Sequence, residues 1–171
     1  VGLGKGVFIK ELEEALLAGD IDVAVHSLKD LPTQLHPGLR LACFPKREDP
    51  RDVLVSKGKV GFKELPLGAR IGTSSPRRVA QLLSSYPGLN VVPIRGNVDT
   101  RVSKGLGEDL DGVVVAAAGV KRLGLQDHVS EFLSPALCLP AVGQGALGVE
   151  VRVGDQEILE VLSTVNDFVT E

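Results

Sequence analysis

The sequence predicts an α/β protein with two lobes, each built on parallel-rich sheets with helices on both faces. Short apolar stretches rich in β-branched residues alternate with amphipathic stretches along the 171 residues. A polar stretch bracketed by prolines at 45–51 interrupts this alternation and indicates a crossover between lobes. Hydrophobic residues make up 43% and charged residues 24%, which is typical of a folded chain.

The first lobe opens with a predicted helix. Apolar residues from Phe8 to Leu16 recur at helical spacing, and Gly19 is typical of a helix C-terminal stop. Residues 21–27 are apolar on both faces and β-branched, which predicts a strand buried inside a parallel sheet. Two further strands and a last helix are predicted at 39–44, 146–152 and 155–168.

The second lobe is predicted to contain a βαβαβ series after an initial strand at 52–55. Such a series implies parallel strands joined by right-handed crossovers. Its strands are expected at 70–73, 89–95 and 112–117, with helices at 76–86 and 97–106. A return crossover is expected at 140–146.

Composition excludes several function classes. A net charge of −3 and 4% aromatic residues argue against a nucleic-acid partner. No apolar run approaches the roughly 20 residues of a membrane span. Two distant cysteines, Cys43 and Cys138, fit neither a disulfide scaffold nor a zinc site, so both are expected in the core and no metal is expected. Together with the lack of a signal-peptide pattern, this favours a cytoplasmic location.

Cations follow three successive strands of the second lobe, although the whole chain is acidic. Arg77 and Arg78 follow a Ser75-Pro76 turn suited to a helix N-terminus. Arg95 and Arg101 flank the next turn, where Asn97 is the expected cap, and Lys121 and Arg122 follow the third strand. Each arginine alone is commonly a solvated surface residue, but their repetition at one sheet edge indicates an anion site. Arginine favours carboxylate or phosphate, and the absence of a GxxxxGK[ST] loop favours carboxylate.

The first predicted strand ends in a different set of groups, His26, Lys29 and Asp30. Asp30 is a general acid/base, a group that stabilises a developing cation or, as is commoner, a helix cap or turn residue before Pro32. Lys29 is either an anion contact or solvated. His26 is either catalytic or, as is commoner, a packed and hydrogen-bonded histidine.

Six segments together resemble the porphobilinogen deaminase (hydroxymethylbilane synthase) family over nearly the whole chain. They are GKGVFIKELEEALLAGDIDVAVHSLKDLPT, KREDPRDVLVS, IGTSSPRRVAQL, IRGNVDTR, AAAGVKRLGL and LPAVGQGALGVEVR. The family joins four porphobilinogens head to tail, releases ammonia at each step and supplies haem biosynthesis. The resemblance implies a fold whose first two domains resemble type II periplasmic binding proteins.

The resemblance also assigns roles to residues of this chain. Asp30 matches the catalytic carboxylate, which assists departure of the amino group and stabilises the resulting cation. The expected contacts to carboxylates of the dipyrromethane cofactor and growing chain are Lys29, Ser75, Arg77, Arg78, Arg95 and Arg101. Arg122 and Gln144 are the expected substrate contacts. The implied partners are porphobilinogen and the growing polypyrrole, in a protein that is monomeric when complete.

By the same resemblance, residues 1–46 and 146–168 form part of domain 1 and 51–140 form domain 2, with hinge crossovers at 45–51 and 140–146. An N-terminal segment and a third domain, which carries the cofactor-attachment cysteine in the family, are expected to be absent. The first lobe is therefore expected to be incomplete and the chain alone inactive. Two alternatives remain: a non-catalytic binding lobe for an anionic metabolite, and a phosphate-binding enzyme.

Overall fold

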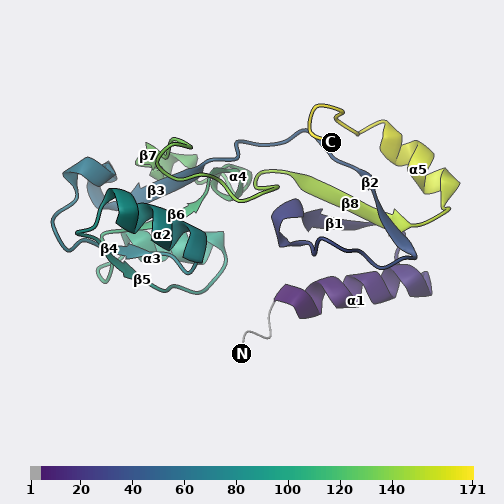
Figure 1. The fold of residues 1–171 in the computed structure, drawn as a ribbon, viewed down its shortest axis with the longest axis horizontal. Helices are drawn as coiled ribbons and strands as arrows, with labels where there is room; N and C mark the ends of the chain where they lie inside the picture. Colours follow the sequence, from purple (N-terminus) through teal and green to yellow (C-terminus); the bar gives the residue numbers. More distant parts are fainter. Residues whose placement is uncertain (1–4) are drawn as a thin grey trace. The chain divides into compact units, whose positions relative to one another are not determined.

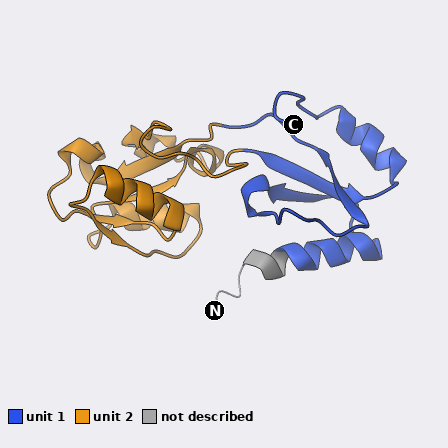
Figure 2. Cartoon of the chain, viewed as in Figure 1, with its two compact units in different colours: residues 1–48, 146–171 blue, residues 49–145 orange. Residues whose placement is uncertain are grey.

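The structure, a computed structural model, describes the backbone of residues 5–171 and the side chains from Ile9 onward. The chain divides into two compact units, one formed by 1–48 with 146–171 and the other by 49–145 (Figure 2). The boundaries fall inside the segments predicted as crossovers. The assignment of these units to domains of a longer protein stays a prediction.

The first unit contains a three-stranded sheet in the order β1-β8-β2 (Figure 1). Its elements are α1 (Lys5–Ala18), β1 (Ala24–Ser27), the 3-10 turn η1 (Leu28–Asp30), β2 (Leu39–Cys43), β8 (Leu147–Arg152) and α5 (Gln156–Ser163). The predicted helix stop is confirmed, because Gly19 follows α1 with a φ of 79° that favours glycine. Leu16 of α1 packs with Ala24 and Leu39 to form the core of this unit.

The expectation of a parallel sheet around 21–27 is wrong. Both β1 and β2 pair antiparallel with β8, a strand that returns from far along the chain. Antiparallel strands often have one solvated face, and Val25 of β1 is accordingly 59% exposed. The last helix is also shorter than predicted, because Asn166 and Asp167 bind the backbone of Phe44 in place of continuing α5.

The second unit contains a five-stranded sheet in the order β5-β4-β6-β3-β7. Its strands are β3 (Asp52–Ser56), β4 (Arg70–Gly72), β5 (Asn90–Val92), β6 (Gly112–Ala116) and β7 (Glu131–Phe132). Its helices are α2 (Pro76–Ser85), α3 (Val98–Leu106) and α4 (Ala117–Arg122), with 3-10 turns η2 (Lys57–Lys59), η3 (Phe62–Glu64) and η4 (Gln126–His128). The parallel pairing of β5, β4 and β6 confirms the predicted βαβαβ series, and β3 joins antiparallel to β6.

Helices cover both faces of this second sheet, as predicted. Val53 and Val55 of β3 pack with Val102 of α3 on one face. Leu54, which points the opposite way, packs with Leu82 of α2 on the other face. None of the described helices is both long enough and apolar enough to cross a membrane.

Candidate functional site

The candidate site begins at the edge of the second unit where the parallel strands β4, β5 and β6 end. Because β3 is antiparallel to β6, its first residue lies at this same edge, and Asp52 pairs in register with Ala116. Ligands of open α/β sheets bind beyond the carboxyl ends of the parallel strands. Asp52 is therefore a buried acid placed at the edge where the sequence predicts cations.

The Asp52 carboxylate is fully buried and joins two arginines. Nη2 of Arg77 lies 2.6 Å from one carboxylate oxygen, and Nη2 of Arg78 lies 2.7 Å from the other. Burial alone raises the pKa of Asp52, but the charges and hydrogen bonds of Arg78 and Arg77 outweigh it and hold that pKa below its usual value. Asp52 is thus ionised at neutral pH.

Two further side chains complete the surroundings of Asp52. Gln144 Nε2 donates to Asp52 Oδ1 at 2.9 Å and to the Pro50 carbonyl at 2.6 Å. The Cys138 thiol lies 3.4 Å from Asp52 Oδ2, and burial together with the Asp52 charge raises the pKa of this thiol. Both cysteines are buried, as predicted. Gln144, an expected substrate contact, is only 1% exposed, and its amide hydrogen-bonds the buried Asp52 carboxylate.

Each guanidinium group has a second anchor on the backbone. Arg78 Nη1 donates to the Val114 carbonyl at 3.0 Å, and Arg77 Nη1 donates to the Leu139 carbonyl. Arg78 is 7% exposed, so its position is set by the interior of the unit. The Arg78 Nε is buried and has no hydrogen-bond partner among the described residues.

The turn that carries these arginines has the predicted construction. Ser75 is the N-cap of α2, its hydroxyl accepts from the Arg78 backbone N–H at 3.5 Å, and Pro76 occupies the first turn. The preceding Ser74 hydroxyl donates to the Ile94 carbonyl at 2.6 Å and accepts from the Ile94 N–H at 2.9 Å. These bonds hold the end of β4 beside the end of β5.

The segment after β5 brings a third arginine to this edge. Arg101 Nε donates to the Gly96 carbonyl at 2.7 Å. Burial and the nearby Arg78 charge lower the pKa of Arg101. Arg95 is exposed, and its carbonyl accepts from Lys104 Nζ at 3.0 Å. Asn97 occupies the predicted cap position of α3, but its side chain makes no cap hydrogen bond.

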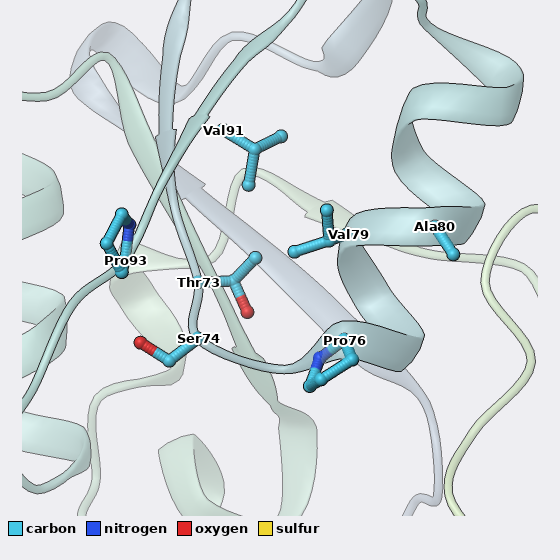
Figure 3. Close-up of a pocket in the computed structure, with 7 residues that line it drawn as sticks. All are labelled: Thr73, Ser74, Pro76, Val79, Ala80, Val91 and Pro93. Carbon is cyan, nitrogen blue, oxygen red and sulfur yellow. The ribbon is translucent and has the colours of Figure 1, made fainter.

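The charged groups named so far at this edge carry a net positive charge. Arg77, Arg78 and Arg101 contribute three positive charges, and Asp52 contributes one negative charge. This excess of positive charge fits a ligand that carries several carboxylates. A hollow of about 390 Å³ opens beside the Ser75 turn (Figure 3). Seven residues line it: Thr73, Ser74, Pro76, Val79, Ala80, Val91 and Pro93.

The candidate catalytic carboxylate belongs to the other unit. Lys29 and Asp30 are exposed in η1, directly after β1. The turn is tied down because the Leu28 N–H donates to the Ala146 carbonyl at 3.1 Å. Gly148 lies beneath the turn, where a Cβ would come within 3.2 Å of the Leu28 side chain.

His26 is a packed histidine, which was the commoner of the two roles that the sequence left open for it. It is buried, and its Nε2 lies 3.1 Å from Glu150 Oε2 on the neighbouring strand β8. Burial raises the pKa of Glu150, partly offset by His26, and Glu150 Oε1 has no described hydrogen-bond partner. No group of three or more His, Cys, Asp or Glu in the described chain is arranged to hold a metal ion.

The structure brings four predicted residues to one sheet edge: Ser75, Arg77, Arg78 and Arg101. Arg122 is exposed in the last turn of α4, and Lys29 and Asp30 lie in the first unit. Sequence reasoning missed Asp52. The signal that could have identified Asp52 is its position as the first residue of a strand in which every residue is buried. A carboxylate at such a position requires a cationic partner.

Comparison with known proteins identifies relatives of the chain. Residues 2–160 match the family model described as porphobilinogen deaminase, dipyromethane cofactor binding domain. The chain is 57% identical over 164 residues to porphobilinogen deaminase of Syntrophotalea carbinolica, covering 96% of this chain and 52% of the relative. It is 54% identical over 169 residues to porphobilinogen deaminase of Bacillus thuringiensis, covering 98% and 55%. The chain thus spans about half the length of the curated relatives it matches.

Solved structures confirm the predicted fold class. A periplasmic substrate-binding protein of an ABC transporter from Coxiella burnetii matches with a TM-score of 0.58 and 18% identity, covering 92% of this chain and 76% of that one. A YaeC-family lipoprotein from Enterococcus faecalis matches with a TM-score of 0.61 and 13% identity, covering 97% and 86%. The fold is therefore α/β of the type II periplasmic-binding-protein kind. By its sequence match over nearly its full length, the chain belongs to the porphobilinogen deaminase family.

Proposed function

We propose that the protein containing this chain is a hydroxymethylbilane synthase, which joins four porphobilinogens head to tail and releases one ammonia at each step. The observation that best supports this proposal is the excess of arginine charge around Asp52 at one sheet edge. Porphobilinogen carries acetate and propionate groups, so the growing polypyrrole is a polyanion that such an edge can bind. Membership of the family supplies the reaction class.

The same site fits the dipyrromethane cofactor that the family model names. The residues proposed to hold its carboxylates and those of the growing chain are Lys29, Ser75, Arg77, Arg78, Arg95 and Arg101. When bound, the cofactor supplies the pyrrole end from which the chain grows. Arg122 is proposed to bind substrate carboxylates, and Gln144 supports the site through Asp52.

Asp30 is the proposed catalytic residue. Its carboxyl group is exposed, and it lies in a turn that the Leu28–Ala146 backbone hydrogen bond holds in place. It assists departure of the substrate amino group and stabilises the positive charge that develops on the methylene carbon. We also propose that the protein is cytoplasmic and monomeric. The two buried, unpaired cysteines are consistent with a reducing compartment.

The proposal is tested with Asp30→Asn in a polypeptide of the relatives' full length. We expect turnover of porphobilinogen to fall by about a hundredfold or more, since a positioned acid contributes about that much, while ligand remains bound. Asp20→Asn, which removes an exposed acid of the same unit, is the matched control. A pure binding lobe would show no turnover before the substitution and unchanged binding after it, and this result would overturn the proposal. Assay of the 171-residue chain alone is expected to show no sustained consumption.

A further inference from the structure

Asp52 lies at the centre of the predicted anion site but is itself an anion. Its two oxygens accept from Nη2 of Arg77 and Nη2 of Arg78, at 2.6 and 2.7 Å. It is fully buried, so it does not reach solvent or ligand directly. Any role in binding must therefore act through the two guanidinium groups.

The contacts constrain the orientation of both arginines. The Arg78 guanidinium is held between Asp52 and the Val114 carbonyl, and the Arg77 guanidinium is held between Asp52 and the Leu139 carbonyl. A planar guanidinium bonded through both Nη atoms is restricted in rotation about its final side-chain bonds. An arginine fixed in this way loses little further entropy when a carboxylate binds.

We propose that Asp52 is a positioning residue, which holds the Arg77 and Arg78 guanidinium groups in the orientation that receives the carboxylates of the cofactor and of the growing chain. This inference rests on the proposed function, because it takes a polycarboxylate as the ligand. Its consequence is counterintuitive: removing a negative charge from an anion-binding site weakens the binding of an anion. If Asp52 only neutralised the arginines, its removal would strengthen that binding.

The sign of the effect is measured with Asp52→Asn in the full-length protein. An asparagine of nearly the same shape supplies one carbonyl oxygen in place of the two charged oxygens that the guanidinium groups use. Porphobilinogen is the probe, because its acetate and propionate groups are those of each unit of the growing chain. We expect its Kd, measured by calorimetry, to rise about tenfold or more, as befits the loss of charge-assisted hydrogen bonds. In steady-state assays KM rises and kcat is retained, because the lost interaction is made in ground and transition states alike.

Asp111→Asn is the matched control. It removes the same charge from the same unit, but Asp111 accepts from the Arg70 N–H at the opposite, amino end of the parallel strands. We expect its Kd to equal that of the unmutated protein. An unchanged or lower Kd in folded Asp52→Asn, or an equal loss in Asp111→Asn, would overturn the inference.

A second measurement covers the case in which Asp52→Asn does not fold. In the unmutated protein without ligand, the Nη–H protons of Arg77 and Arg78 should give separate, slowly exchanging signals in proton–nitrogen spectra. One averaged signal for each arginine means that Asp52 does not hold the groups, and the inference fails. If the unmutated protein does not bind porphobilinogen, the proposed function fails, and these spectra still decide whether Asp52 orients the arginines.

Discussion

At the residue scale, the fold shifts the pKa values of two buried acids in opposite directions. Asp52 and Glu150 are both fully buried. Two guanidinium groups outweigh the burial of Asp52 and lower its pKa, whereas burial dominates at Glu150 and raises its pKa despite His26. Linkage between protonation and folding then gives the two acids opposite pH dependences.

Asp52 stabilises the folded state above the usual pKa of an aspartate. This contribution is lost as the pH falls through the lowered pKa of Asp52, because protonation of the carboxylate in the folded state removes its ion pairs with the two arginines. We expect Asp52→Asn to lose about 3 kcal/mol of unfolding free energy at neutral pH, the penalty for replacing the carboxylate that pairs with both guanidinium groups by a neutral amide. Urea unfolding at several pH values should show the deficit shrinking toward acid. A deficit independent of pH would contradict this account.

The contribution of Glu150 to stability depends on pH in the opposite direction to that of Asp52. Its folded state holds a proton more tightly than the unfolded chain, so its stabilisation is present below the usual glutamate pKa and is lost as the pH rises through its raised value. Glu150→Gln removes this dependence. We expect the variant to gain stability relative to the unmutated protein in urea unfolding as the pH rises above the usual glutamate pKa. Parallel pH profiles of the two proteins would refute the expectation.

At the scale of elements, a close approach between α3 and β6 sets the position of the Arg101-bearing helix. Gly105 of α3 faces Val113 of β6, where an added Cβ would lie 2.6 Å from a Val113 methyl carbon. Val113 is fully buried within the core and has little room to move. The glycine thus allows the helix to pack directly onto the strand.

Gly105→Ala should therefore destabilise the protein although alanine is the better helix former. We expect a loss of about 1–3 kcal/mol from overpacking, which exceeds the roughly 1 kcal/mol gained in helix propensity. Ser103→Ala, on the exposed surface of the same helix, is the control and should be neutral or slightly stabilising. Chemical denaturation of both variants gives the comparison. Increased stability of Gly105→Ala would show that the packing yields easily.

At the scale of the whole molecule, the two units differ in how the chain builds them. The second unit is one continuous segment, 49–145, whereas the first is assembled from 1–48 and 146–171. The second unit also has a core on each face of its sheet. A continuous segment with its own core has what an independently folding domain needs.

A polypeptide of residues 49–145 should fold by itself. We expect a single cooperative unfolding transition, followed by circular dichroism in urea, with the same midpoint when measured by the fluorescence of Tyr86. Tyr86 suits this purpose because it stacks on Phe62 at a centroid distance of 5.1 Å in the same unit. A gradual transition, or two different midpoints, would mean that this segment depends on the remainder of the chain.

Several elements could be predicted because their signals are local. The Ser75-Pro76 start of α2 and the Gly19 stop of α1 depend on capping and backbone conformation within a few residues. The βαβαβ order followed from strands and helices that are neighbours in the sequence. The arginines at the strand ends followed from that order.

Predictions from local sequence patterns were wrong where segments far apart in the sequence contact each other in the fold. The strand at 21–27 has the apolar composition of a parallel strand, but β8, more than a hundred residues later, pairs with it antiparallel. Gln144 appears polar and available in the sequence, yet it is buried against Asp52. The arginine anion site was predicted from residue types at the strand ends, whereas the catalytic role of Asp30 and the individual ligand contacts came from the family motifs.

The chain's motifs and periodicity were sufficient for its α/β class, its family and the cationic edge, because each depends on residue types at short spacing. Strand direction in the first unit, the ion pairs of Arg77 and Arg78, and the place of Asp52 depended on long-range pairing. Asp52 reaches the arginines only because β3 runs antiparallel to β6 and begins where the parallel strands end. Burial then makes that single charge decisive, since a carboxylate without water must find its partners in the folded protein.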